Sequence, residues 1–70
     1  MDKKIRSKFS NNLKKYRSKN KLTQQKLAEL AEMEYKYIQR IEGKNPPAVR
    51  IDTIAKLAKA LRVHPSQLLI

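Results

Sequence analysis

Four side chains that could bind the edges of nucleobases recur at helical spacing between residues 35 and 40. Tyr35, Lys36, Gln39 and Arg40 follow the order i, i+1, i+4, i+5, which places them on one face of a helix. Lysine and arginine donate to guanine, glutamine pairs with adenine, and a tyrosine ring contacts a thymine methyl or a phosphate. Ile38 and Ile41 would then face inward. The alternative is an ordinary solvated helix face.

The chain offers little for other chemistry. It has no cysteine and a single histidine, His64, so neither a thiolate nor a multi-histidine metal site can form. No serine or carboxylate is placed beside His64 in a catalytic motif, and we expect His64 to cap or decorate the last helix. The sequence therefore predicts no enzyme, no metal and no cofactor.

Charge indicates the kind of partner. The 70 residues contain 17 Lys+Arg against 6 Asp+Glu, for a net charge of +11. Such an excess favours an anionic partner, which can be a nucleic acid, an anionic membrane or an acidic protein. The chain has neither a long apolar run nor an apolar N-terminal leader, so we expect a cytoplasmic protein with no membrane partner and no small-molecule ligand. Its length predicts one domain over residues 1–70.

Apolar residues repeat at helical spacing and predict an all-α, compact five-helix fold with no strand. The helices are expected at residues 2–19, 24–31, 35–42, 51–61 and 65–69. The stripes expected to face the core are clearest in the first and fourth helices: Ile5, Phe9, Leu13 and Tyr16, then Ile51, Ile54, Leu57, Ala58 and Leu61.

Residues that begin or end helices mark the breaks. Thr23 is a predicted N-cap, because its hydroxyl can accept a backbone N–H from the next turn. Asn20 and Gly43 follow helices, where a left-handed residue is commonly found. Pro65 suits the first position of the last helix.

Two of the predicted helices are short and are joined by three residues, which is the plan of a helix-turn-helix over residues 24–42. The first helix of such a pair braces across the DNA backbone, and the second lies in the major groove. Ala28 and Ala31 supply the small side chains that a close helix crossing needs.

Four runs, in this order and spacing, resemble the lambda repressor/Cro-like helix-turn-helix family. They are LTQQKLA at 22–28, YIQRIEGK at 37–44, the helix at 51–61 and VHPSQLL at 63–69. The resemblance spans about residues 9–69 and implies a lambda-repressor-like DNA-binding domain. The Tyr37-Ile38 pair is also similar to restriction–modification controller proteins and phage repressors.

The sequence departs from the family pattern in the turn and at two helix starts. Glu32 stands where the family usually has glycine, so it must either become left-handed, at about 1 kcal/mol, or reshape the turn. Glu34 replaces the usual serine cap of the second helix of the motif, and Arg50 replaces the serine before the fourth.

The resemblance implies further DNA contacts. Gln24 would bind a phosphate and brace the recognition helix, with Thr23 a cap first and a phosphate ligand second. Tyr37 has two possible roles, contact with a phosphate or packing against the first helix. The loop that carries Lys44, Asn45 and Arg50 would meet the DNA backbone, although basic loops can also serve solubility alone.

The family pattern also implies a structural ion pair. It often places an arginine late in the first helix opposite the glutamate that ends the third, and Arg17 and Glu42 match both positions. A half-buried pair would lock the recognition helix to the scaffold, whereas two unrelated surface charges would not.

The chain ends in three apolar residues, Leu68, Leu69 and Ile70. These residues close the core or form a two-fold contact between copies. Both hold if Leu68 faces inward and Leu69 or Ile70 faces outward. The predicted function is a sequence-specific, repressor-like transcriptional regulator acting as a homodimer on a palindromic operator. The alternatives are an antitoxin-like protein-interaction module whose DNA binding is secondary, and a membrane-surface peptide, which would need one long amphipathic helix.

Overall fold

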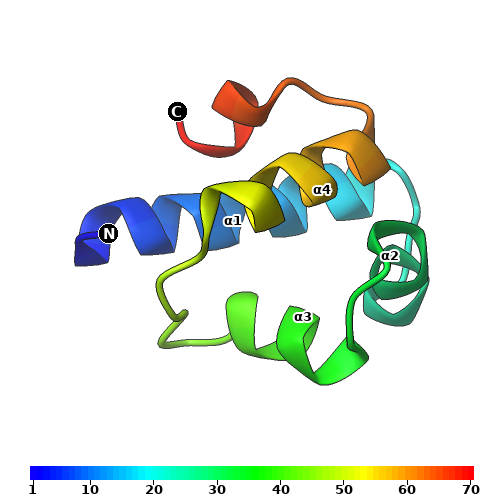
Figure 1. Ribbon diagram of the computed structural model, residues 1–70, viewed down its shortest axis with the longest axis horizontal. Helices are drawn as coiled ribbons and strands as arrows, with labels where there is room; N and C mark the ends of the chain where they lie inside the picture. The colour runs from blue at the N-terminus through cyan, green and yellow to red at the C-terminus, as the bar shows by residue number, and fades with distance from the viewer.

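The chain folds into four α-helices and one short 3-10 helix, with no strand. The computed structural model covers residues 1–70 and places α1 at Lys3–Lys19, α2 at Gln24–Ala31, α3 at Tyr35–Ile41, α4 at Ile51–Leu61 and the 3-10 helix η1 at Pro65–Leu68 (Figure 1). The all-α prediction is confirmed. None of the helices has the length and the apolar character needed to cross a membrane.

The prediction of five α-helices is wrong at the C-terminal end, where η1 is a 3-10 helix. Its backbone bonds join residues three apart, from Gln67 N–H to His64 O (2.9 Å) and from Leu69 N–H to Ser66 O (3.0 Å). His64 caps it, since the Ser66 N–H donates to His64 Nδ1 and the His64 N–H donates to Gln67 Oε1. Both bonds form a capping box at the start of η1, where Pro65 is the first residue of the helix.

Polar caps begin the first two helices. The Ile5 N–H donates to Asp2 Oδ1 (2.9 Å) at the start of α1, and the Lys26 N–H donates to Thr23 Oγ1 (3.0 Å) at the start of α2. The predicted Thr23 cap is therefore present. After α1 the left-handed residue is Lys21, with φ of 58°, and not Asn20. The Asn20 side chain instead donates to Tyr16 O, which draws Asn20 back onto the helix.

The turn between α2 and α3 keeps its usual geometry at a conformational cost. Glu32 takes the left-handed conformation (φ 56°, ψ 49°), the first of the two options open to it. The turn is closed by the Met33 N–H, which donates to Ala28 O (2.9 Å). Small side chains at Ala28 and Ala31 are buried where α2 packs against α3 and α4.

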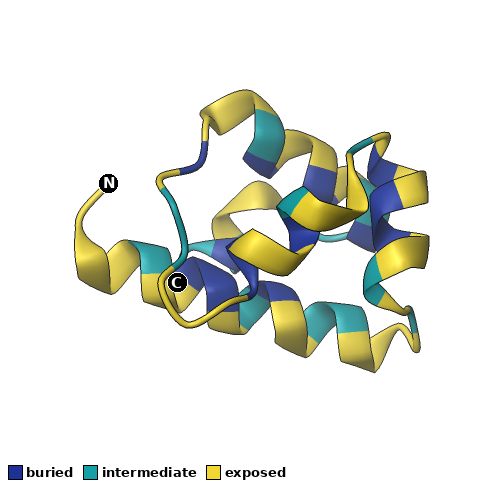
Figure 2. Cartoon of the chain, turned by 90° about the horizontal axis from the view of Figure 1, so that it is seen from below, coloured by how far each residue is buried: buried dark blue, intermediate teal, exposed yellow.

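One cluster of 13 buried hydrophobic residues joins all the elements. Phe9 and Leu13 enter from α1, Leu27 from α2, and Ile38 and Ile41 from α3, all with no exposed surface. The 3-10 helix η1 packs against both α1 and α4, which closes the core at the end of the chain. Figure 2 shows the buried residues gathered on the inner faces of the helices.

Two predicted core residues are on the surface. Ile5 is 42% exposed and Ile51 is 82% exposed. Ile5 lies in the first turns of α1, which project beyond the other helices (Figure 1). Ile51 is the first residue of α4 and lies at the margin of its apolar stripe. Helical periodicity gives the direction of a side chain but not whether a partner lies there.

Candidate nucleic-acid interface

The outer face of α3 is formed by the four residues that the sequence selects. Tyr35, Lys36, Gln39 and Arg40 are exposed, because the buried Ile38 and the other isoleucine of α3 hold the inner face. Gln39 Nε2 donates to Tyr35 Oη (3.1 Å), so two of the four side chains already contact each other. The structure therefore presents one cation-rich face that can donate hydrogen bonds.

Tyr37 lies at the edge of this face and is half-buried. Its side chain packs against the hydrophobic core, and neither of its two predicted roles, packing against the first helix or contact with a phosphate, is decided by this contact. Its remaining surface lines a hollow of about 390 Å³ together with Met33, Lys36 and Arg40. Packing and an outward contact are thus compatible at this position.

The start of α2 faces the end of α3. Thr23 Oγ1 is engaged as the cap of α2, and Gln24 is half-buried. Gln24 Nε2 donates to Glu42 Oε1 (3.0 Å), which ties the first residue of α2 to the residue that follows α3. This bond is the bracing role that the resemblance implies for Gln24.

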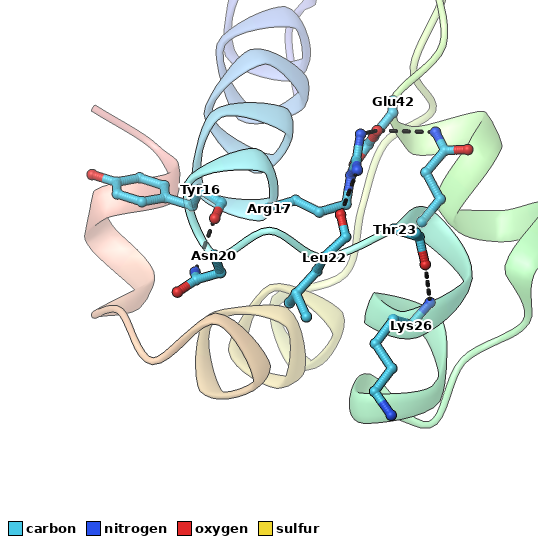
Figure 3. Close-up of polar contacts among 8 residues, drawn as sticks. Tyr16, Arg17, Asn20, Leu22, Thr23, Lys26 and Glu42 are labelled. Carbon is cyan, nitrogen blue, oxygen red and sulfur yellow. Dashed lines mark hydrogen bonds and ion pairs between the residues drawn. The ribbon is translucent and has the colours of Figure 1, made fainter.

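Arg17 and Glu42 form a bidentate ion pair. Arg17 Nε lies 2.7 Å from Glu42 Oε2, and Arg17 Nη2 lies 2.9 Å from Glu42 Oε1. Arg17 Nη1 also donates to Leu22 O (2.8 Å), as Figure 3 shows. The exposed fractions of the two side chains are 17% and 2%. With Gln24, the carboxylate of Glu42 accepts three hydrogen bonds, which join α1, α2 and α3.

The loop after α3 turns tightly beneath it. A Cβ at Gly43 would lie 3.3 Å from the carbonyl oxygens of Gln39 and Arg40, so a side chain there would crowd the backbone. The reason for glycine is therefore this close approach. The expected left-handed conformation is absent, because no glycine has a positive φ.

The basic residues of this loop separate into two places. Lys44 and Asn45 are exposed and lie with Arg40 on the wall of one cleft. Arg50 does not line that cleft. It is exposed before α4, with Nη2 3.9 Å from Asp52 Oδ2, a separation typical of a weak surface pair.

The far wall of the cleft is a site that the sequence reasoning missed. The first half of α1 faces Arg40 and the loop across a cleft of about 760 Å³, here called the basic cleft. Five of its six α1 side chains follow the spacing i, i+1, i+4, i+5, i+8, which begins with the pattern of the outer face of α3, and Arg6 is the sixth. This spacing can be read from the sequence, but it was not singled out there. The cations of the basic cleft are Lys3, Lys4, Arg6, Lys8, Arg40 and Lys44.

The three residues at the end of the chain have different environments. Leu68 has no exposed surface and belongs to the core, as expected for the inward residue of the three, so its side chain is not available to a dimer contact. Leu69 is half-buried against the core, and Ile70 is 77% exposed. Asn12 Nδ2 donates to Leu68 O (3.1 Å) and Ile70 O (3.0 Å), which holds this segment against α1.

The helices α2 and α3 are short and are joined at a tight turn. The outer face of α3 is basic and its inner face is anchored in the core. These features define a helix-turn-helix DNA-binding domain. Comparison with known proteins agrees with this class. The model of the Cro/C1-type HTH DNA-binding domain family matches residues 12–70. The chain belongs to this family, and the resemblance to lambda repressor/Cro-like proteins is confirmed.

Two solved structures are similar to most of the chain. The restriction-modification controller protein C.AhdI from Aeromonas hydrophila is 32% identical, with a TM-score of 0.83 over 90% of this chain and 94% of that one. The hypothetical transcription factor NHTF from Neisseria is 27% identical, with a TM-score of 0.90 over 99% of this chain and 78% of that one. No curated protein matches the chain. The general function is DNA binding of the kind found in transcription regulation.

Proposed function

We propose that this chain, residues 1–70, is one helix-turn-helix domain that binds double-stranded DNA in a sequence-specific manner, with α3 in the major groove. The observation that carries the proposal is the outer face of α3, where Tyr35, Lys36, Gln39 and Arg40 are all exposed. The major groove admits an α-helix, and these side chains match the donors and acceptors that distinguish its base pairs.

The residues around α3 suit a positioning role on the phosphates. Lys44 and Asn45 follow the C-terminal end of α3, and Gln24, with the cap Thr23, lies at the same end through its bond to Glu42, where a strand that borders the groove would pass. Tyr37 and Arg50 extend this set. Phosphate contacts fix the register of the protein on the duplex, and the outer face of α3 reads the sequence.

We further propose that the chain acts as a homodimer on a palindromic operator. A seven-residue helix reads only a few base pairs, and a two-fold arrangement doubles the site. Ile70, with Leu69 beside it, offers an exposed apolar side chain at the C-terminal end of a surface that is otherwise strongly basic. A two-fold contact needs a self-complementary patch, and like charges elsewhere would repel.

Selection of bound sequences from a random duplex pool tests the proposal. We expect enrichment of a palindromic consensus whose half-sites are centred about one helical turn apart, ~34 Å. A consensus without two-fold symmetry would refute the homodimer. Failure to enrich any sequence, with binding equal on all duplexes, would refute sequence-specific reading by α3.

A further inference from the structure

The basic cleft gathers six cations from segments that are far apart in the chain. Lys3, Lys4, Arg6 and Lys8 lie on α1, whereas Arg40 belongs to α3 and Lys44 to the following loop. None of them forms a salt bridge, and no carboxylate lines the cleft. Figure 2 shows that the first turns of α1 are almost entirely exposed. This concentration of unpaired like charge disfavours the fold, and an anionic ligand would neutralise it.

The lining of the basic cleft suits a solvated strand of phosphates better than a small ligand. Pockets for small molecules are mostly apolar with a few polar groups, whereas this cleft has no hydrophobic side chain apart from the two loop prolines. Its α1 wall runs from Lys3 to Asn11, which are separated by eight helical steps, or roughly 12 Å. That length corresponds to about three successive phosphates of one strand measured along the duplex axis.

The position of the basic cleft connects it to the reading face. Arg40 is shared, because it belongs to the outer face of α3 and also lines the cleft. Lys44 and Asn45, proposed phosphate contacts, form the wall next to Arg40. A strand that borders the major groove and passes Lys44 would therefore continue along the lysines of α1.

We propose that the basic cleft binds the sugar-phosphate backbone of the same duplex, just beyond the major groove that α3 occupies. This inference rests on the proposed function and extends it. The first half of α1 then acts as a second backbone contact, which lengthens the site without adding sequence preference. Three additional neutralised phosphates raise affinity and make binding more dependent on salt.

The test compares two triple variants with the same net charge. The cleft variant carries Lys3→Gln, Lys4→Gln and Lys8→Gln. The control variant carries Lys19→Gln, Lys56→Gln and Lys59→Gln, at lysines that are also exposed but lie outside the cleft. Far-UV circular dichroism checks that both are folded. Duplex affinity is then measured as a function of salt, on the selected site with long flanks and on a duplex trimmed to that site.

We expect the slope of log K against log[salt] to become shallower by about 2.7 for the cleft variant, from about 0.9 for each of three phosphates. The control variant should change the slope by much less. The loss of affinity of the cleft variant should be the same for every duplex sequence. It should be smaller on the trimmed duplex, which lacks the flanking phosphates.

Equal effects of the two triple variants would overturn the inference, since net charge alone would explain them, and the proposed function would stand. The inference would also be overturned if the cleft variant lost affinity for inorganic tripolyphosphate while its duplex binding did not change. That result would indicate a small-anion site. If the wild-type protein binds no duplex, the proposed function fails and the cleft inference fails with it.

Discussion

Replacing Arg17 with methionine would leave the carboxylate of Glu42 buried beside a single remaining donor. That carboxylate is 2% exposed and now accepts two bonds from Arg17 and one from Gln24. Breaking a buried pair by removing one partner costs roughly 3–5 kcal/mol, because an uncompensated charge stays inside. Arg17 is 17% exposed, so water can reach its side of the pair, and we expect about 3 kcal/mol.

This loss is large for a protein of this size. Typical stabilities of 0.05–0.15 kcal/mol per residue amount to roughly 4–10 kcal/mol for 70 residues. A loss of about 3 kcal/mol should lower Tm by roughly 12–24 °C, since each kcal/mol is equivalent to 4–8 °C in a domain of 60–100 residues. Urea and thermal unfolding followed by circular dichroism measure both quantities.

The double variant Arg17→Met/Glu42→Met shows how much of the lost stability comes from the unpaired buried charge and how much from lost packing. It removes both charges and keeps apolar volume, so it should be more stable than Arg17→Met alone. Gln24 and Leu22 then lose their partners, but both are half-exposed and water can replace those bonds. A cost below about 1 kcal/mol for Arg17→Met, or a double variant less stable than the single one, would refute the reasoning.

Three further predictions concern DNA reading, assembly and the turn. Arg40→Ala should cost about 1–3 kcal/mol on the preferred site and relax specificity there, while Lys44→Ala weakens all sequences similarly; equal losses on every sequence in a binding titration would contradict this assignment. Ile70→Lys should give a monomer in sedimentation, whereas the control Ile51→Lys, at a similarly exposed residue, should leave the dimer intact. A wild-type protein that stays monomeric at high concentration would exclude the proposed dimer. Glu32→Gly should stabilise the protein by about 1 kcal/mol in urea unfolding, because glycine adopts φ of 56° without strain, and a loss of stability would show that Glu32 makes a compensating interaction.

The helices were largely predictable because their determinants are local. Thr23 precedes an apolar stripe and caps α2 as expected, and the three residues 32–34 separate two short helices in the sequence and in the structure. The left-handed Glu32 was one of two stated options. Hydrogen bonds between residues three to five apart in the chain form all of these features.

The errors occur where distant parts of the chain decide the outcome. Ile5 and Ile51 fit apolar stripes, but no neighbouring element covers them. At Gly43 the nearby carbonyl oxygens of α3 would crowd a side chain, a constraint that a residue type alone does not reveal.

Only part of the candidate interface could be predicted from the sequence. The outer face of α3 follows from six consecutive residues and is present as expected. Lys3, Lys4, Ser7 and Lys8 of α1 have the same spacing, but their position opposite Arg40 depends on how α1 lies relative to α3. Helical spacing therefore identified one wall of the interface, and only the tertiary structure reveals the other.

Anchoring and the proposed reading of bases use different residues of α3, and this division has an evolutionary consequence. Ile38, Ile41 and Glu42 hold the helix through the core and the ion pair, while the one side-chain hydrogen bond among the outer residues joins Tyr35 to Gln39. Substitutions on the outer face would therefore change operator preference at little cost in stability. A duplicated copy of this protein could acquire a new operator through a few outer substitutions while its scaffold stays under purifying selection.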